Sequence, residues 1–142
     1  MESEFLISEE IKRRIKAANK RFYANDCIAE FFEDGEKEML IDELTCRFEG
    51  VLETLIIDTE NDPNSQATGK RLAKMYVNEL MAGRYTEMPN ATCFPNHVDN
   101  GYKGMLVVRS ELKSMCSHHH QPVAGIAYIG IIAADKLIGL SK

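Results

Sequence analysis

The chain has 142 residues, of which 44% are hydrophobic and 27% are charged, and its formal net charge is −5 at pH 7. This composition fits one globular domain and excludes a disordered or membrane-embedded chain. The negative charge argues against general nucleic-acid binding, although a few local cations are enough to hold a phosphorylated small molecule.

The sequence begins Met1-Glu2-Ser3-Glu4, without a basic segment followed by an apolar run, so we expect no secretory signal. The longest apolar stretch, 126–134, is interrupted by Gly130 and is far shorter than the roughly 18 residues that span a bilayer. We therefore expect a cytoplasmic protein that contacts no membrane. In that compartment cysteines stay free or bind metal, and we expect Cys27 and Cys46 to be small buried residues on helices.

Residues 8 to about 33 are predicted to be helical, with Ser8 as the N-cap and acidic residues in the first turn. Asn25-Asp26 is a candidate break that would divide this helix into two pieces, and Gly35 ends it. The apolar residues that define its buried face are Ile11, Ile15, Ala18 and Phe22.

Two further helices are predicted in the first half of the chain. The second runs from about 36 to 57 along an apolar stripe, and the turn-forming residues of 58–66 then form a loop. Thr68 is expected to cap the third helix, which covers about 69–82, and Gly83 is expected to follow its C-terminus.

The character of the sequence changes after residue 100. Residues 102–109 alternate and are rich in β-branched side chains, which predicts a strand, and 122–132 predicts a longer strand with Gly125 as a candidate bulge or close backbone approach. A lone hairpin is marginally stable in water. We therefore expect further strands, either from sequence beyond this chain or from a second chain.

The predicted fold class is α+β, with N-terminal helices followed by an antiparallel β-hairpin. We expect a single domain over 1–142, in which a helical region covers 1–83 and the strand region covers 84–142.

The segment 115–120 holds three of the four histidines and one of the four cysteines. Thiolate and imidazole are ligands that zinc prefers, and Cys116 and His119 have C-x-x-H spacing. His118 lies between them, where an imidazole would move protons beside a metal. His120 is expected to be a packing or rim residue. The spacing therefore predicts metal-assisted chemistry, and the plainer alternative is a histidine-rich surface loop.

A second pair complicates this prediction. Cys93 and His97 have C-x-x-x-H spacing, and with Cys116 and His119 they would make a closed Cys2His2 structural site. Pro95 lies inside that pair, and a whole predicted strand separates it from the other, so we favour the catalytic alternative. A catalytic zinc takes at least three protein ligands, and only two are evident here.

Lys142, Arg71 and Lys70 are candidate ligands for an anion. Arg71 and Lys70 lie in the first turn of the third predicted helix, where backbone N–H groups also favour anions. An ordinary solvated helix face explains them equally well. The sequence has no Gly-rich phosphate loop of the Walker or Rossmann type and no G-x-S-x-G serine motif.

Six segments within roughly residues 60–142 resemble the GTP cyclohydrolase I family in their order and spacing. The C-x-H-H core and the G-L-S-K ending are specific in combination. The segments are Arg71–Leu80, Phe94–Asn96, Val107–Arg109, Ser114–His119, Ala127–Ile129 and Ile138–Lys142.

This resemblance implies a T-fold (tunnelling fold), in which two hairpins flank a pair of helices, and it implies an enzyme. Members of the family open the imidazole ring of GTP, release C8 as formate and reclose the product as 7,8-dihydroneopterin triphosphate. Folate, biopterin and deazaguanine biosynthesis all begin with this step. Carried over, Cys116 and His119 would bind Zn2+, whose bound water attacks C8, and His118 would protonate the imidazole nitrogen of the purine.

The resemblance also implies contacts with the substrate and with partner chains. Ser141 and Lys142 match positions that contact GTP, with Lys142 on the triphosphate, and Arg71 matches an arginine near the phosphates. Family members assemble as toroidal homodecamers with active sites at subunit boundaries. We expect either such a homo-oligomer or a complementing C-terminal chain, with GTP as substrate and no nucleic acid.

The sequence departs from the family pattern at three points. Ser117 stands where the family usually has Glu, and His120 stands where it has an apolar residue. The family sequence also continues past residue 142, where it supplies a third zinc ligand, a cysteine, and a glutamate that reads the guanine edge. The alternative is therefore a non-catalytic zinc-binding assembly module, or a truncated or split paralogue of the enzyme.

Overall fold

The computed structural model describes residues 6–97 and 101–139. Its contacts divide the chain into two compact units, Met1–Glu87 and Met88–Lys142. The described helices all lie in the first unit and the described strands all lie in the second, so the α+β class is confirmed. The assignment of residues 1–142 to a single domain stays a prediction.

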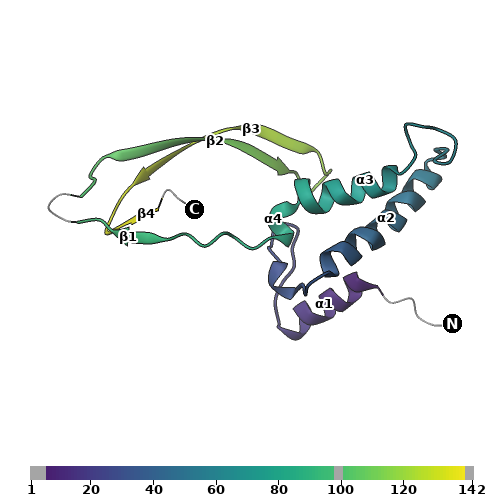
Figure 1. Cartoon of the computed structure of the whole chain (residues 1–142), viewed down its shortest axis with the longest axis horizontal. Coiled ribbons are helices and arrows are strands. Elements are labelled where there is room, and N and C mark those ends of the chain that lie inside the picture. Colours follow the sequence, from purple (N-terminus) through teal and green to yellow (C-terminus); the bar gives the residue numbers. More distant parts are fainter. Residues whose placement is uncertain (1–5, 98–100, 140–142) are drawn as a thin grey trace. The chain divides into compact units, whose positions relative to one another are not determined.

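The helical unit has four α-helices and two shorter helical turns within its described residues (Figure 1). A 3-10 turn stands before α2, and a π-helical turn continues α3. The elements are α1 (Ile7–Ala17), the 3-10 turn (Ala29–Phe31), α2 (Glu36–Thr54), α3 (Thr68–Met75), the π-helical turn (Tyr76–Leu80) and α4 (Ala82–Tyr85).

The first helix is shorter than the sequence predicts. α1 ends at Ala17, and Asn19 then takes a positive φ of 52°, which turns the chain away from the helix axis. Ser8 does not cap the helix, because it lies inside the first turn. Its backbone N–H and its Oγ instead donate to the carboxylate of Glu43 on α2, at 3.0 and 2.6 Å.

The ends of the other helices also differ from the prediction. Thr68 is the first residue of α3, and Ala67 occupies the N-cap position with φ 56°. Gly83 lies inside α4 and does not follow a helix. The π-helical turn explains the difference, because the Met81 N–H donates to the Tyr76 carbonyl at 2.9 Å and closes one wide turn before α4 begins.

The core of the helical unit lies between α1, α2 and α3, and Figure 1 shows α2 and α3 side by side. Ile15 and Val77 are its largest fully buried side chains. The remaining buried members are Ile7, Ile11, Ile28, Leu40, Ile41 and Ala73.

Gly69 marks a close approach between α2 and α3. A Cβ at this position would lie 2.6 Å from Glu49 Cγ and 3.0 Å from the carbonyl oxygen of Thr45, both on α2. The absence of a side chain at Gly69 therefore permits the two helices to pack closely.

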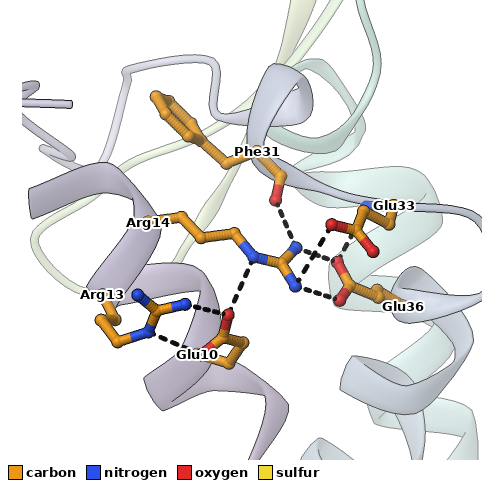
Figure 2. A network of polar contacts seen from close by, with 6 residues as sticks. All are labelled: Glu10, Arg13, Arg14, Phe31, Glu33 and Glu36. Atoms are coloured by element: carbon orange, nitrogen blue, oxygen red, sulfur yellow. Dashed lines mark hydrogen bonds and ion pairs between the residues drawn. The ribbon is translucent and has the colours of Figure 1, made fainter. Parts of the chain in front are cut away.

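A guanidinium clamp joins α1 to α2 and to the 3-10 turn (Figure 2). Arg14 donates through both Nη atoms to the carboxylate of Glu36, at 2.7 and 2.8 Å, and through Nε to Glu10 at 3.0 Å. It also donates to the carbonyl of Phe31 at 3.2 Å. The hydrogen bonds from Arg14 hold the pKa of the Glu36 carboxyl below its ordinary value.

Arg84 ties the segment after α1 to the end of the helical unit. Its guanidinium donates to the carbonyls of Tyr23 and Asp26, at 2.6 and 2.9 Å. It also donates to the carbonyl of Phe22 at 3.3 Å, and the Ile28 N–H donates to the Arg84 carbonyl at 2.8 Å. These bonds hold Phe22 and Ile28 against the core, although neither residue lies in a helix.

The burial predicted for two cysteines is wrong. Cys27 and Cys46 are both exposed, and all four cysteines are free. Cys27 follows the early end of α1 and lies in a loop, where its thiol meets the carbonyl of Thr86 at 3.5 Å. Cys46 lies about 200° around α2 from Leu44, which packs against the core.

The second unit contains two pairs of antiparallel strands within its described residues. β2 (Met105–Met115) pairs with β3 (Pro122–Ile132), and β1 (Cys93–Pro95) pairs with β4 (Lys136–Ile138). The second predicted strand matches β3, whereas the first predicted strand begins too early and ends too soon. The β1–β4 pair was not predicted.

The bulge proposed at Gly125 is wrong. Gly125 pairs with Leu112 in an unbroken register between β2 and β3, and a Cβ there would meet no atom within 4 Å. No described residue of the second unit is buried. Among the residues that the structure describes, none of the helices has the length and hydropathy that crossing a bilayer requires.

Candidate functional site

A tight turn between β2 and β3 carries the cysteine and the three consecutive histidines. β2 ends at Met115, and β3 begins at Pro122, whose missing N–H is tolerated at the first residue of a strand. The Cys116 N–H donates to the carbonyl of Gln121, and the His120 N–H donates to the carbonyl of Cys116, both at 2.9 Å. These two bonds close a loop of four residues, 117–120.

The side chains in this turn bring sulfur and imidazole nitrogen together. Cys116 Sγ lies 3.9 Å from His118 Nδ1. The His118 and His119 rings are stacked, with centroids 6.5 Å apart and planes inclined by 28°. Cys116 is half-buried, and both histidines are exposed.

This donor set fits zinc, because a thiolate and an imidazole are the ligands that the ion prefers. The contact that the structure gives to the sulfur is with His118, the residue predicted to carry the proton. The pairing of Cys116 with His119 as ligands, and the acid role of His118, stay predictions.

The described residues, 6–97 and 101–139, contain no group of three or more Cys, His, Asp or Glu side chains placed to share one ion. Cys93 lies in β1, and His97 lies in the loop after it. The structure therefore does not bring Cys93, His97, Cys116 and His119 together into one closed site.

The predicted anion ligands lie at the start of α3, in the helical unit. Arg71 is exposed, and its Nη2 donates to the carbonyl of Asn64 at 2.9 Å and to Thr68 Oγ1 at 2.6 Å. Arg71 thus holds the preceding loop against the helix, a local role that the sequence analysis did not consider. Lys70 is exposed. The predicted phosphate contact of Arg71 stays a prediction.

Ser141 and Lys142, the other predicted substrate contacts, lie outside the described residues.

Sequence reasoning missed the residues whose backbone shapes the turn. His120 has a φ of 53°, in the left-handed region that Gly and Asn favour, and Gln121 provides the carbonyl that accepts from Cys116. The usual signal for such a position is a glycine or an asparagine, and the sequence has a histidine there.

Comparisons with known proteins identify the relatives of this sequence. Residues 45–142 match the sequence model of the family described as GTP cyclohydrolase I. Curated relatives named GTP cyclohydrolase 1 include one from Aeromonas salmonicida, which is 38% identical over 94 residues, or 65% of this chain and 42% of the relative. A relative from Erwinia tasmaniensis is 34% identical over 117 residues, which cover 81% of this chain and 50% of the relative. A relative from Flavobacterium johnsoniae is 35% identical over 109 residues, which cover 74% of this chain and 47% of the relative.

Helices followed by an antiparallel hairpin define an α+β protein consistent with part of a T-fold. The chain belongs to the GTP cyclohydrolase I family. It spans about half the length of the curated relatives that it matches.

Proposed function

We propose that the chain takes part in the GTP cyclohydrolase I reaction, the hydrolytic opening of the GTP imidazole ring with release of formate and reclosure to 7,8-dihydroneopterin triphosphate. The observation that carries this proposal is the β2–β3 turn. It gathers Cys116, His118 and His119 in a chain of this family.

In this proposal Cys116 and His119 hold Zn2+, which when bound would activate water for attack on the purine carbon C8. His118 acts as the general acid that protonates the imidazole nitrogen as the ring opens. An imidazole suits that task because its ordinary pKa lies close to neutral pH. The position of His118 between the two ligands supports the assignment.

The remaining substrate contacts are part of the proposal. Arg71 and Lys142 would neutralise the triphosphate, and Ser141 would contact GTP beside Lys142. A third zinc ligand would come from outside the described residues, because within them no group of three Cys, His, Asp or Glu side chains is placed to share one ion. We therefore propose that the working site forms in a homo-oligomer or with a complementing C-terminal chain.

Metal binding is tested first. Purified chain is titrated with Zn2+ and with Co2+, whose absorption reports thiolate ligation. Cys116→Ser and His119→Ala are expected to lose the bound metal, and His97→Ala is the matched control that keeps it. Unchanged metal content in both Cys116→Ser and His119→Ala would refute the assignment of the ligands.

Catalysis is tested by incubation with GTP, followed by oxidation and detection of neopterin fluorescence. The chain is assayed alone and together with the part of the Erwinia tasmaniensis relative that it does not span. His118→Ala is expected to abolish the fluorescence while zinc is retained. Full activity in His118→Ala would contradict the acid role.

The second candidate is a non-catalytic zinc-binding assembly module, or a truncated or split paralogue. Ser117, at a position where the family usually has a glutamate, favours it. It predicts bound zinc without neopterin fluorescence under either assay condition. Product formation in the complemented sample would exclude the non-catalytic module.

A further inference from the structure

The backbone of His120 is the one unusual conformation in the β2–β3 turn. Its φ of 53° lies in the left-handed region, where contact between Cβ and the backbone disfavours L-residues, β-branched ones most and Asn, Asp and His least. The neighbouring strands follow an unbroken antiparallel register from Met105↔Ile132 to Met115↔Pro122. The chain therefore reverses direction within four residues, and His120 is where it rejoins the strand.

Two hydrogen bonds depend on this conformation. The His120 N–H donates to the carbonyl of Cys116, and the Cys116 N–H donates to the carbonyl of Gln121, the residue directly after His120. The backbone of Cys116 is thus held on both of its sides, and the φ of His120 orients the Gln121 carbonyl that accepts from the Cys116 N–H. Cys116 Sγ lies 3.9 Å from His118 Nδ1 in the same turn.

We propose that His120 is a positioning residue for the metal-binding turn, and that its left-handed backbone orients Cys116 toward the ion that it would share with His119. This inference rests on the proposed function, because it concerns how the turn presents its ligands to zinc.

The physical argument concerns how often the metal-free loop adopts the conformation that binds metal. A metal-free loop samples several conformations, and the apparent dissociation constant of the metal rises in proportion as the binding-competent conformation becomes rarer. A β-branched residue at position 120 disfavours the left-handed conformation strongly, whereas glycine adopts it freely and asparagine tolerates it. The side chain at position 120 therefore tunes zinc affinity through the conformation of the backbone.

The test compares four variants by titration with Zn2+ and by the thiolate absorption of bound Co2+. His120→Gly and His120→Asn are expected to bind at least as tightly as the parent chain, and His120→Val is expected to bind about five-fold more weakly or worse. His97→Val is the matched control, an exposed histidine of the same unit without a positive φ, and its affinity is expected to be unchanged.

Two results would overturn the proposal. If His120→Val binds metal as tightly as the parent chain, the left-handed backbone does not limit binding. If His120→Gly and His120→Asn weaken binding as much as His120→Val does, the imidazole ring is what matters.

A second measurement needs no metal. Amide hydrogen exchange of Cys116 and His120 in the metal-free protein reports the two bonds that close the turn. Exchange is expected to be faster in His120→Val and to be restored to parental values in His120→Asn, with the β2–β3 amides unchanged. If the parent chain binds no metal, the zinc role in the proposed function fails, while this exchange comparison still decides the role of the His120 backbone.

Discussion

The close approach of α2 and α3 at Gly69 allows a sharp test of how the helical unit is packed. Gly69 is buried against α2, and a Cβ at this position would meet the Thr45 carbonyl at 3.0 Å and the Glu49 N–H nitrogen at 3.2 Å. Both are backbone atoms of a helix and cannot rotate away, so Gly69→Ala must push the two helices apart. Overpacking of this kind costs about 1–3 kcal/mol.

Gly50 is the matched control on α2, because a Cβ there would meet no atom within 4 Å. Alanine is preferred to glycine by about 1 kcal/mol inside a helix. Gly50→Ala should therefore stabilise the helical unit by up to about 1 kcal/mol. Gly69→Ala should destabilise it by up to about 2 kcal/mol, after the gain in helix propensity is subtracted from the cost of overpacking.

Urea unfolding followed by far-UV circular dichroism measures both changes, since the helices dominate that signal. The expected result is a midpoint that falls for Gly69→Ala and rises for Gly50→Ala. If both midpoints move in the same direction by similar amounts, the close approach of α2 and α3 at Gly69 is refuted.

Three further changes have clear expected outcomes. Ile56→Gly should stabilise the helical unit by about 1 kcal/mol in urea unfolding, because Ile56 has a φ of 61° and is 93% exposed. Glu36→Gln should lower stability at neutral pH but flatten its decline below about pH 5, since a carboxylate with a depressed pKa stabilises above its unfolded pKa and loses that contribution on protonation. Arg71→Met should speed amide exchange in the loop 58–66, because the bond to the Asn64 carbonyl is lost.

Each of these predictions has its own control. Ile56→Ala keeps the unfavourable φ and should stabilise the helical unit little. If it stabilises the unit as much as Ile56→Gly does, the φ of residue 56 does not explain the increase. Glu38→Gln changes an exposed carboxylate on the same helix and should leave the acid profile unaltered. Lys70→Met removes the neighbouring exposed cation, and loop exchange as fast as in Arg71→Met would show that charge, not the Asn64 bond, orders the loop.

The helical unit shows where sequence patterns stop being sufficient. The apolar residues from Ile11 to Phe32 continue a helical spacing, yet α1 ends at Ala17 and the later ones reach the core from a loop and a 3-10 turn. The spacing predicts which side chains face the core. It does not predict whether a helix, a loop or a 3-10 turn carries them. Asn19 carries the turn, and its asparagine, a residue that tolerates a positive φ, is a signal that the prediction missed.

The sequence predicted only the part of the candidate site that lies within one short segment. Cys116, His118 and His119 lie within four positions of one another, so the prediction of a loop between two strands already placed them together. A third ligand depends on contacts between distant parts of a sequence, which local spacing does not reveal. The left-handed φ of His120 was missed for a related reason, because histidine carries no conformational signal comparable to that of glycine.

The π-helical turn Tyr76–Leu80 has a consequence for the geometry of the whole helical unit. One additional residue in a helical turn rotates everything that follows by about 100°. The guanidinium that holds the carbonyls of Tyr23 and Asp26 stands four residues beyond this insertion, at Arg84. Deletion of one residue from this turn would rotate Arg84 away from these carbonyls and release the segment that it holds. We therefore expect this stretch to tolerate substitutions better than changes of length.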